Sequence, residues 1–152
     1  MSLRIFHHHS YSSLVLPERH RFPLAKYQAL YQTLSEQGYP LTLASPVSRA
    51  QLERVHDAAY VDAALTGTLD RDAIRRLGFP WSLQLIERTL HSVGATLAAS
   101  RHALGEGCGL QVSGGYHHAH RDFGSGFCLF NDLVIAAQTC LDEGRCERVL
   151  IL

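Results

Sequence analysis

Apolar positions along the chain follow helical spacing in several segments, and this pattern predicts the helices. Over residues 24–38, apolar and aromatic side chains recur three and four positions apart until Gly38 and Pro40, which predicts an amphipathic helix. The longest periodic stretch runs from Trp81 to about Leu104 and predicts the longest helix. Further helices are expected over residues 57–65, 70–77 and 130–141.

Short apolar runs between these segments predict strands. The runs cover residues 3–6, 41–43, 110–113 and 148–152. Because helices alternate with short apolar strands, the order predicts an α/β fold in which helices flank a parallel sheet.

Composition excludes several classes of protein. The 152 residues carry 14 basic and 14 acidic side chains, so the formal net charge is zero, which argues against direct binding of nucleic acid. No apolar run approaches the roughly 18 residues of a membrane span, and the N-terminus lacks the apolar segment of a signal peptide. The four cysteines form no CxxC motif, so they indicate packing thiols. We therefore expect a cytoplasmic protein without a membrane or nucleic-acid partner.

The ten histidines are the unusual feature of the composition, and residues 114–132 (GGYHHAHRDFGSGFCLFND) hold the most informative of them. This loop follows a predicted strand, where open parallel sheets form their ligand crevice. Gly114 and Gly115 allow a sharp turn. Neighbours on a regular strand point to opposite faces, so His117 and His118 can serve one site only on an irregular backbone. Such a pair can hold one neutral base and one cation near neutral pH.

Each feature of this loop also has a purely structural explanation. A histidine pair can be solvated, a Gly-Ser-Gly segment can be a plain turn, and Phe127 can belong to the core. Asn131 and Asp132 can cap the following helix, or they can have a role in a site, and the pattern favours neither alternative. The occurrence of all these features in one loop favours a functional site.

The other histidines suggest less. His7, His8 and His9 are interpreted mainly as the edge of the first strand, because no carboxylate stands at ligand spacing from them; a metal site is the less favoured alternative. His56, His91 and His102 are expected on helices, at the surface or as satisfied core residues, and His20 and His120 are expected in loops.

The loop at 114–132 resembles the histidine-pair loop of the zinc-dependent histone deacetylase family, particularly of its bacterial and class IV-like members. The family form is GG, any residue, HHA, and then GFC and ND. Residues 17–27 (PERHRFPLAKY), 55–61 (VHDAAYV) and 78–97, which begin GFPWS, resemble further family segments in the same order. The resemblance implies an arginase/deacetylase-like three-layer fold. It also implies that residues 148–152 (RVLIL) form the central strand that carries the family's metal site.

The resemblance implies roles for individual loop residues. His118 corresponds to the general base and acid, and His117 to the companion imidazole that stabilises charge. Phe127 corresponds to one wall of a narrow acyl-lysine tunnel, and Gly126 to the position beside it. An internal channel for the acid product is implied near Gly114, Gly115 and Lys26.

The family reaction is the hydrolysis of an N-acyl amide, in which zinc polarises the carbonyl and a neutral histidine takes a proton from the bound water. The implied substrate is an acetylated lysine in a histone or other protein, or an acetylated small amine. The family's zinc ligands, in the pattern Asp, any, Asp, any, His, begin just where residue 153 would be. We therefore expect zinc in the complete domain and none in this chain alone.

These expectations make residues 1–152 the N-terminal part of a single deacetylase catalytic domain, truncated after the strand between Arg148 and Leu152 and inactive by itself. The alternative is a non-catalytic fragment that acts as a binding or pairing module, with an exposed sheet edge that forms an oligomer. A nucleotide-binding domain is disfavoured because no phosphate-loop spacing follows a strand.

Overall fold

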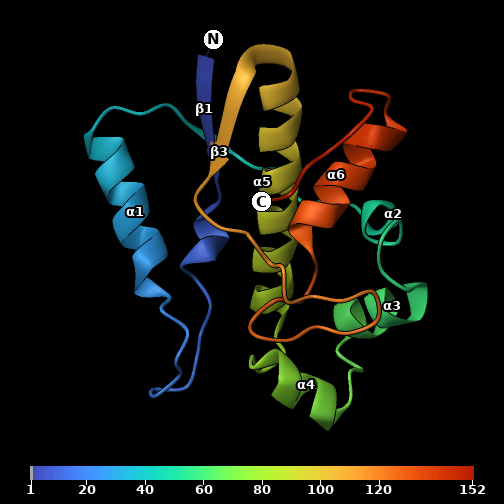
Figure 1. Cartoon of the computed structure of the whole chain (residues 1–152). Coiled ribbons are helices and arrows are strands. Elements are labelled where there is room, and N and C mark those ends of the chain that lie inside the picture. Colours follow the sequence, from blue (N-terminus) through green and yellow to red (C-terminus); the bar gives the residue numbers. More distant parts are fainter. Residues whose placement is uncertain (1) are drawn as a thin grey trace.

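The structure, a computed structural model, describes residues 2–152 and contains a three-stranded parallel sheet (Figure 1). Strand β1 (Ser2–His7) lies in the middle, between β2 (Leu41–Leu43) and β3 (Gly107–Gln111). Both pairings are parallel, and Ile5 lies opposite Leu41 on one side and Leu110 on the other. The parallel sheet predicted from the pattern is therefore confirmed.

Helices α1 (Ala25–Glu36) and α5 (Leu83–Glu106) pack on opposite faces of this sheet (Figure 1). Successive side chains of a strand point to opposite faces. Accordingly, Ile5 packs in one buried cluster with Tyr27 of α1, whereas Phe6 packs in another with Ala95 of α5. The sheet thus forms the middle layer of three.

The remaining helices extend the core beyond the sheet. Helix α6 (Asp132–Asp142) packs along α5, while α2 (Arg49–Leu52), α3 (Ala58–Thr66) and α4 (Arg71–Leu77) lie beside the first half of α5 (Figure 1). The largest buried cluster joins these elements and includes Leu52, Val61, Leu77, Leu85, Phe130 and Ile135. No helix within residues 2–152 has both the length and the apolar character that a bilayer span requires.

The helix boundaries follow local capping chemistry. Helix α5 begins after Ser82, whose hydroxyl accepts a hydrogen bond from the backbone N–H of Leu85. It continues through Gly105 to Glu106, two residues beyond the predicted end. Helix α6 begins at Asp132 rather than at Phe130, because Asn131 caps it by accepting from the N–H of Val134.

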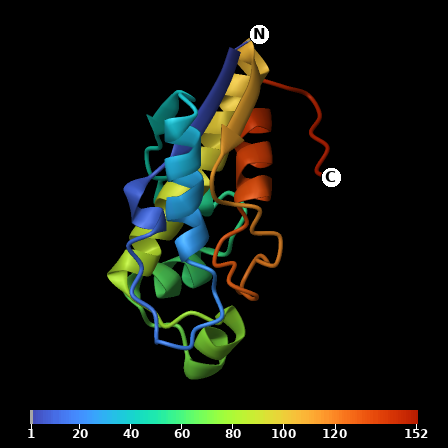
Figure 2. The same cartoon turned by 90° about the vertical axis from the view of Figure 1, so that its left-hand side faces the viewer.

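The strand expected between Arg148 and Leu152 is wrong for this structure. The segment is irregular and lines one side of a groove of about 470 Å³ together with α5 and α6, and Leu150 is 79% exposed. A strand is stable only when its N–H and C=O groups pair with a neighbouring strand, and these residues join no sheet. Figure 2 shows this end of the chain leaving the body of the protein.

Candidate functional site

The loop after β3 brings His117 and His118 together. Gly114 and Gly115 have φ angles of 102° and 76°, in the left-handed region that side chains with a Cβ avoid. These two positive φ angles make the backbone irregular just before the histidines. The imidazole rings therefore lie 4.1 Å apart, centroid to centroid, and are inclined by 46°.

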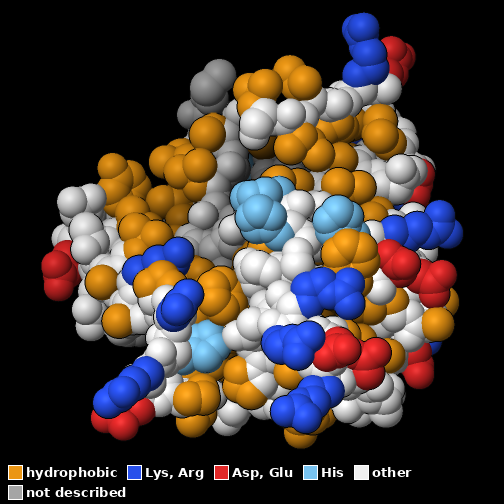
Figure 3. Space-filling view, turned by 60° about the horizontal axis from the view of Figure 1, so that its bottom comes forward, with side chains coloured by type: hydrophobic (Ala, Val, Ile, Leu, Met, Phe, Trp, Pro, Cys, Tyr) orange, Lys and Arg blue, Asp and Glu red, His pale blue; other side chains and the backbone are white. Residues whose placement is uncertain are grey.

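Both imidazoles of the pair are exposed to solvent. Figure 3 shows histidine side chains gathered at the centre of this face of the molecule. The Nδ1–H of His117 donates to the carbonyl oxygen of Gly115 at 3.0 Å. Because a carbonyl only accepts, Nε2 of a neutral His117 keeps its lone pair and can act as a base.

Gly126 lies beside His118, and Gly126 and Phe127 together form a strained turn. A Cβ added to Gly126 would stand 3.2 Å from Cδ2 of His118, and the φ angle of Gly126 is 53°. Among residues 2–152, Phe127 is the one non-glycine residue with a positive φ, at 67°. Its N–H donates to the carbonyl of Leu77 at 2.8 Å, which helps to hold this conformation. Such strain persists where the surrounding structure enforces it, often at functional sites.

The Phe127 ring belongs to an aromatic cluster that the sequence did not reveal. The rings of Phe79, Phe22 and His20 lie 5.1, 5.4 and 5.7 Å from it, centroid to centroid. His20 is fixed at both nitrogens, since Nε2 lies 2.8 Å from the carbonyl of Gly78 and Nδ1 accepts from the N–H of Phe22. His20, expected only as a loop residue, therefore packs against Phe127 and helps to fix its position. No local spacing could indicate this contact, because the residues are far apart in the chain.

Asp132 organises the start of the histidine loop. Its carboxylate is fully buried and accepts hydrogen bonds from the N–H groups of Tyr116 at 2.7 Å and Gly115 at 3.0 Å. Thr96 donates its hydroxyl to the same carboxylate. The sequence pattern left open whether Asn131 and Asp132 cap the helix or serve the site. In the structure, Asn131 caps α6, and Asp132 holds the loop that carries the histidines.

Buried Arg88 supports the same loop through a contact with Tyr116. Its guanidinium donates to the hydroxyl of Tyr116 at 3.2 Å and lies over the rings of Phe22 and Tyr27, 5.0 and 4.8 Å from their centroids. No carboxylate lies within 4.0 Å of it among residues 2–152. Aromatic faces and neutral oxygens therefore compensate this charge, and Arg88 positions the residue that precedes His117.

His56 ties the second half of the loop to the core. Its Nε2 accepts from the N–H of Asn131 at 3.0 Å, and Nδ1 lies 3.2 Å from the carbonyl of Arg121. His56 is buried, as a core histidine with satisfied ring nitrogens, although it follows α2 rather than lying on it. Burial lowers its pKa below the ordinary value, so the neutral form is favoured.

Of the three residues for which the resemblance implies a channel, the structure brings two together. Lys26 and Gly114 line a shallow pocket of about 390 Å³ between α1 and the end of β3. Gly115 lines a different pocket, of about 310 Å³, together with Asp132.

The described residues do not fit a zinc ion at the histidine pair. Within residues 2–152, no third His, Cys, Asp or Glu brings a ligand atom to His117 and His118. The one group of three such ligand atoms in this range lies elsewhere, where residues of α5 meet the end of β1.

Comparisons with known proteins agree with the sequence motifs. The model of the histone deacetylase domain matches residues 20–152. An uncharacterized protein of Picosynechococcus is 41% identical over all of this chain, which spans 52% of that protein. The acetoin utilization protein AcuC of Staphylococcus aureus is 31% identical over 67% of this chain and 28% of its own length.

A solved structure shows the same fold. The crystal structure of the HDA15 HD domain superposes with a TM-score of 0.77 at 17% identity, covering 94% of this chain and 44% of that one. These matches confirm the resemblance and the deacetylase-like α/β fold. The chain thus spans about half or less of the relatives it matches.

Proposed function

Because this chain belongs to the histone deacetylase domain family, we propose that it supplies the histidine half of an active site that hydrolyses N-acyl amides. The observation that carries the proposal is the exposed, closely spaced pair of His117 and His118 beside Gly126 and Phe127. In this proposal residues 1–152 form the N-terminal part of a single catalytic domain.

The two imidazoles divide the proton transfers. Neutral His118 accepts a proton from the attacking water and returns it to the leaving amine, which is the work of a general base and then a general acid. His117, whose Nδ1–H is oriented by the Gly115 carbonyl, stabilises developing charge and can exchange a proton at Nε2. Their 4.1 Å ring separation lets both imidazoles act on one reacting group.

The aromatic wall suits a substrate with an extended apolar stem. Phe127, packed against Phe79 and His20, offers an apolar surface next to Gly126, which adjoins His118. An acetylated lysine in a protein, or an acetylated small amine, combines such a stem with a neutral amide tip. Lys26, Gly114 and Gly115 are proposed to line the exit of the acid product.

The zinc ion typical of the family is expected in the complete domain. Because residues 2–152 do not fit it at the histidine pair, we assign no step of this chain to the metal and expect its ligands outside this range.

The test uses the protein that the gene encodes, with whatever follows residue 152 in the reading frame. With an N-acetyl-lysine peptide reporter, His118→Ala should lower kcat/KM by about 10²-fold or more, as loss of a general base does. His120→Ala is the matched control, because His120 is also exposed and stacks on Phe123 instead. The proposal fails if the parent protein does not hydrolyse the reporter, or if both variants behave alike.

A second candidate is a non-catalytic pairing module, which the outer edge of β3 favours. β3 lies at one edge of the described sheet, and Leu110 on it is 49% exposed. Such an edge can pair with a second copy of the chain. Light scattering after size-exclusion chromatography tests this: a stable dimer without hydrolytic activity supports it, and a monomer excludes it.

A further inference from the structure

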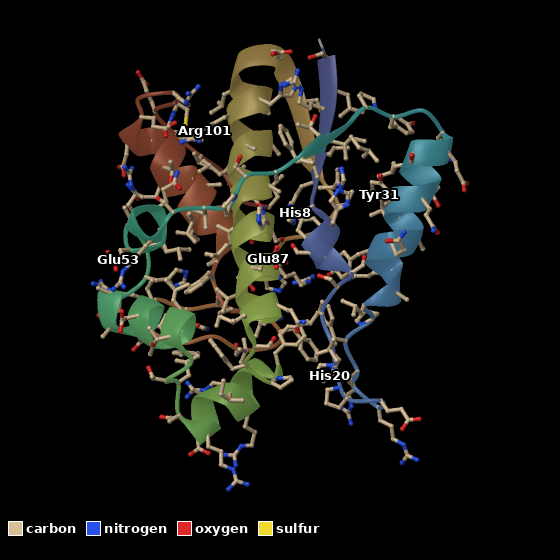
Figure 4. The ribbon with its side chains drawn as sticks, turned by 180° about the vertical axis from the view of Figure 1, so that it is seen from behind. His8, His20, Tyr31, Glu53, Glu87 and Arg101 are labelled. Carbon is tan, nitrogen blue, oxygen red and sulfur yellow. The ribbon has the colours of Figure 1, made fainter. Side chains whose placement is uncertain are left out.

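Three potential metal ligands from distant parts of the chain meet beside α5, outside the histidine-pair loop. One ring nitrogen each of His8 and His91 and one carboxylate oxygen of Glu87 all lie within 4.8 Å of one another. Figure 4 labels His8 and Glu87 at this place, where the end of β1 meets α5. The expectation that His7, His8 and His9 share a strand edge is wrong, because only His7 lies on β1.

Each ligand is positioned by its own element. Glu87 and His91 stand four residues apart on α5, which places them on one face of the helix. His8 is the N-cap of the short 3-10 helix η1 (His9–Tyr11) that follows β1. The rings of His8 and His91 stack face to face, 3.4 Å apart and nearly parallel.

Hydrogen bonds orient both imidazoles, and the one made by His91 already leaves its Nε2 free for a metal. Nδ1 of His91 lies 2.8 Å from the carbonyl of Ala44, to which it must donate, so Nε2 carries the free lone pair. Nδ1 of His8 accepts a hydrogen bond from the backbone N–H of Ser10 at 3.2 Å, so neutral His8 carries its proton on Nε2. Metal binding at Nε2 therefore requires this proton to move to Nδ1, where the Ser10 hydroxyl, 2.8 Å away, can accept it. Outer contacts of this kind set the tautomer and orientation of metal-binding histidines.

The charges around the cluster also favour a cation. Glu87 is exposed and forms no ion pair with the described residues. Two stacked imidazoles beside a carboxylate thus offer two nitrogen ligands and one oxygen ligand.

We propose that His8, Glu87 and His91 bind one divalent transition-metal ion of the zinc type, with water completing the coordination. Two imidazoles and one carboxylate form a ligand set that zinc accepts. Binding requires the parallel rings to tilt so that both lone pairs point at one ion. The ion links the end of β1 to α5. The proposal departs from the expectation that this chain alone holds no metal, and it favours the metal alternative for His8 that the sequence left as the weaker one.

The test measures zinc binding to the untagged chain by isothermal titration calorimetry and cobalt binding by visible absorption. We expect one ion per chain. Glu87→Gln and His91→Ala should each weaken binding at least about ten-fold. The matched control is His9→Ala, since His9 is an exposed neighbour outside the cluster, and it should bind like the parent chain. A double variant, His117→Ala with His118→Ala, should also retain binding.

Circular dichroism establishes that each variant is folded. Glu87→Gln decides the matter if His91→Ala unfolds, because Glu87 is exposed and has no structural partner among the described residues. The proposal is overturned if the parent chain does not bind zinc at millimolar concentration. It is also overturned if Glu87→Gln binds as tightly as the parent, or if His9→Ala or the double variant abolishes binding.

Discussion

The buried carboxylate of Asp132 accepts a hydrogen bond from the backbone N–H of Tyr116, the residue just before the histidine pair, with 2.7 Å between nitrogen and oxygen. Asp132 is the first residue of α6, so a helix N-terminus holds the start of the loop after β3. The same carboxylate also accepts the N–H of Gly115. The position of His117 and His118 therefore depends on a side chain that lies behind the loop.

Asp132→Ala should destabilise the protein by about 2–4 kcal/mol, because it leaves the buried N–H groups of Gly115 and Tyr116 without an acceptor. Urea denaturation measures this change. Asp72→Ala is the control: Asp72 is exposed and forms only a surface ion pair with Arg75, so its loss should cost less than about 0.5 kcal/mol. Equal stability of the two variants would contradict the role of Asp132.

Gly126→Ala should disturb His118 as well as the backbone. The new methyl group would stand 3.2 Å from Cδ2 of His118, and a φ of 53° disfavours any Cβ. We expect a loss of about 1 kcal/mol and a change in the NMR resonances of the His118 ring. Gly38→Ala has a comparable φ of 75° with nothing within 4 Å of the added Cβ, so it should cost stability but leave the His118 resonances unchanged.

Arg88→Lys should cost about 2–3 kcal/mol, although it keeps the positive charge. A lysine ammonium cannot reproduce the planar fork that lies over two aromatic rings and donates to the Tyr116 hydroxyl. Thermal and urea unfolding check the loss. Arg75→Lys, at an exposed ion pair, should leave the unfolding free energy unchanged within error. A tolerated Arg88→Lys would show that the geometry of the guanidinium is unimportant.

The free energy of unfolding should fall as the pH is lowered through 6.5. Burial lowers the pKa of folded His56 below 6.5, so in this range the unfolded chain binds a proton that folded His56 does not. The contribution of His56 is complete above pH 6.5 and declines toward its lowered pKa, by at most about 1.4 kcal/mol per pH unit. His7 and His8 have lowered pKa values too and act in the same direction.

The contribution of His56 is isolated by a variant. His56→Gln should reduce the slope of unfolding free energy against pH between pH 8 and pH 5. His120→Gln, at an exposed histidine, is the control and should show the same slope of unfolding free energy against pH as the parent chain. An unchanged slope in His56→Gln would mean that burial of this imidazole does not couple folding to pH.

Much of the candidate site was readable from the sequence because its residues are close together in the chain. Gly114, Gly115, His117 and His118 lie within five positions, and the two glycines adopt the positive φ angles that such a turn needs. The roles of Asp132 and His20 were not readable, since each acts through a partner from another element.

The sequence by itself determined the parallel α/β order, the histidine loop and the ends of the longer helices to within about two residues, because periodicity and capping depend on neighbours a few residues away. Only the tertiary structure decided that residues 148–152 join no sheet, since a strand needs a partner supplied from elsewhere. Only the tertiary structure brought His8 to Glu87 and His91, across about 80 positions of chain. Such contacts arise from the packing of whole elements, so no local pattern records them.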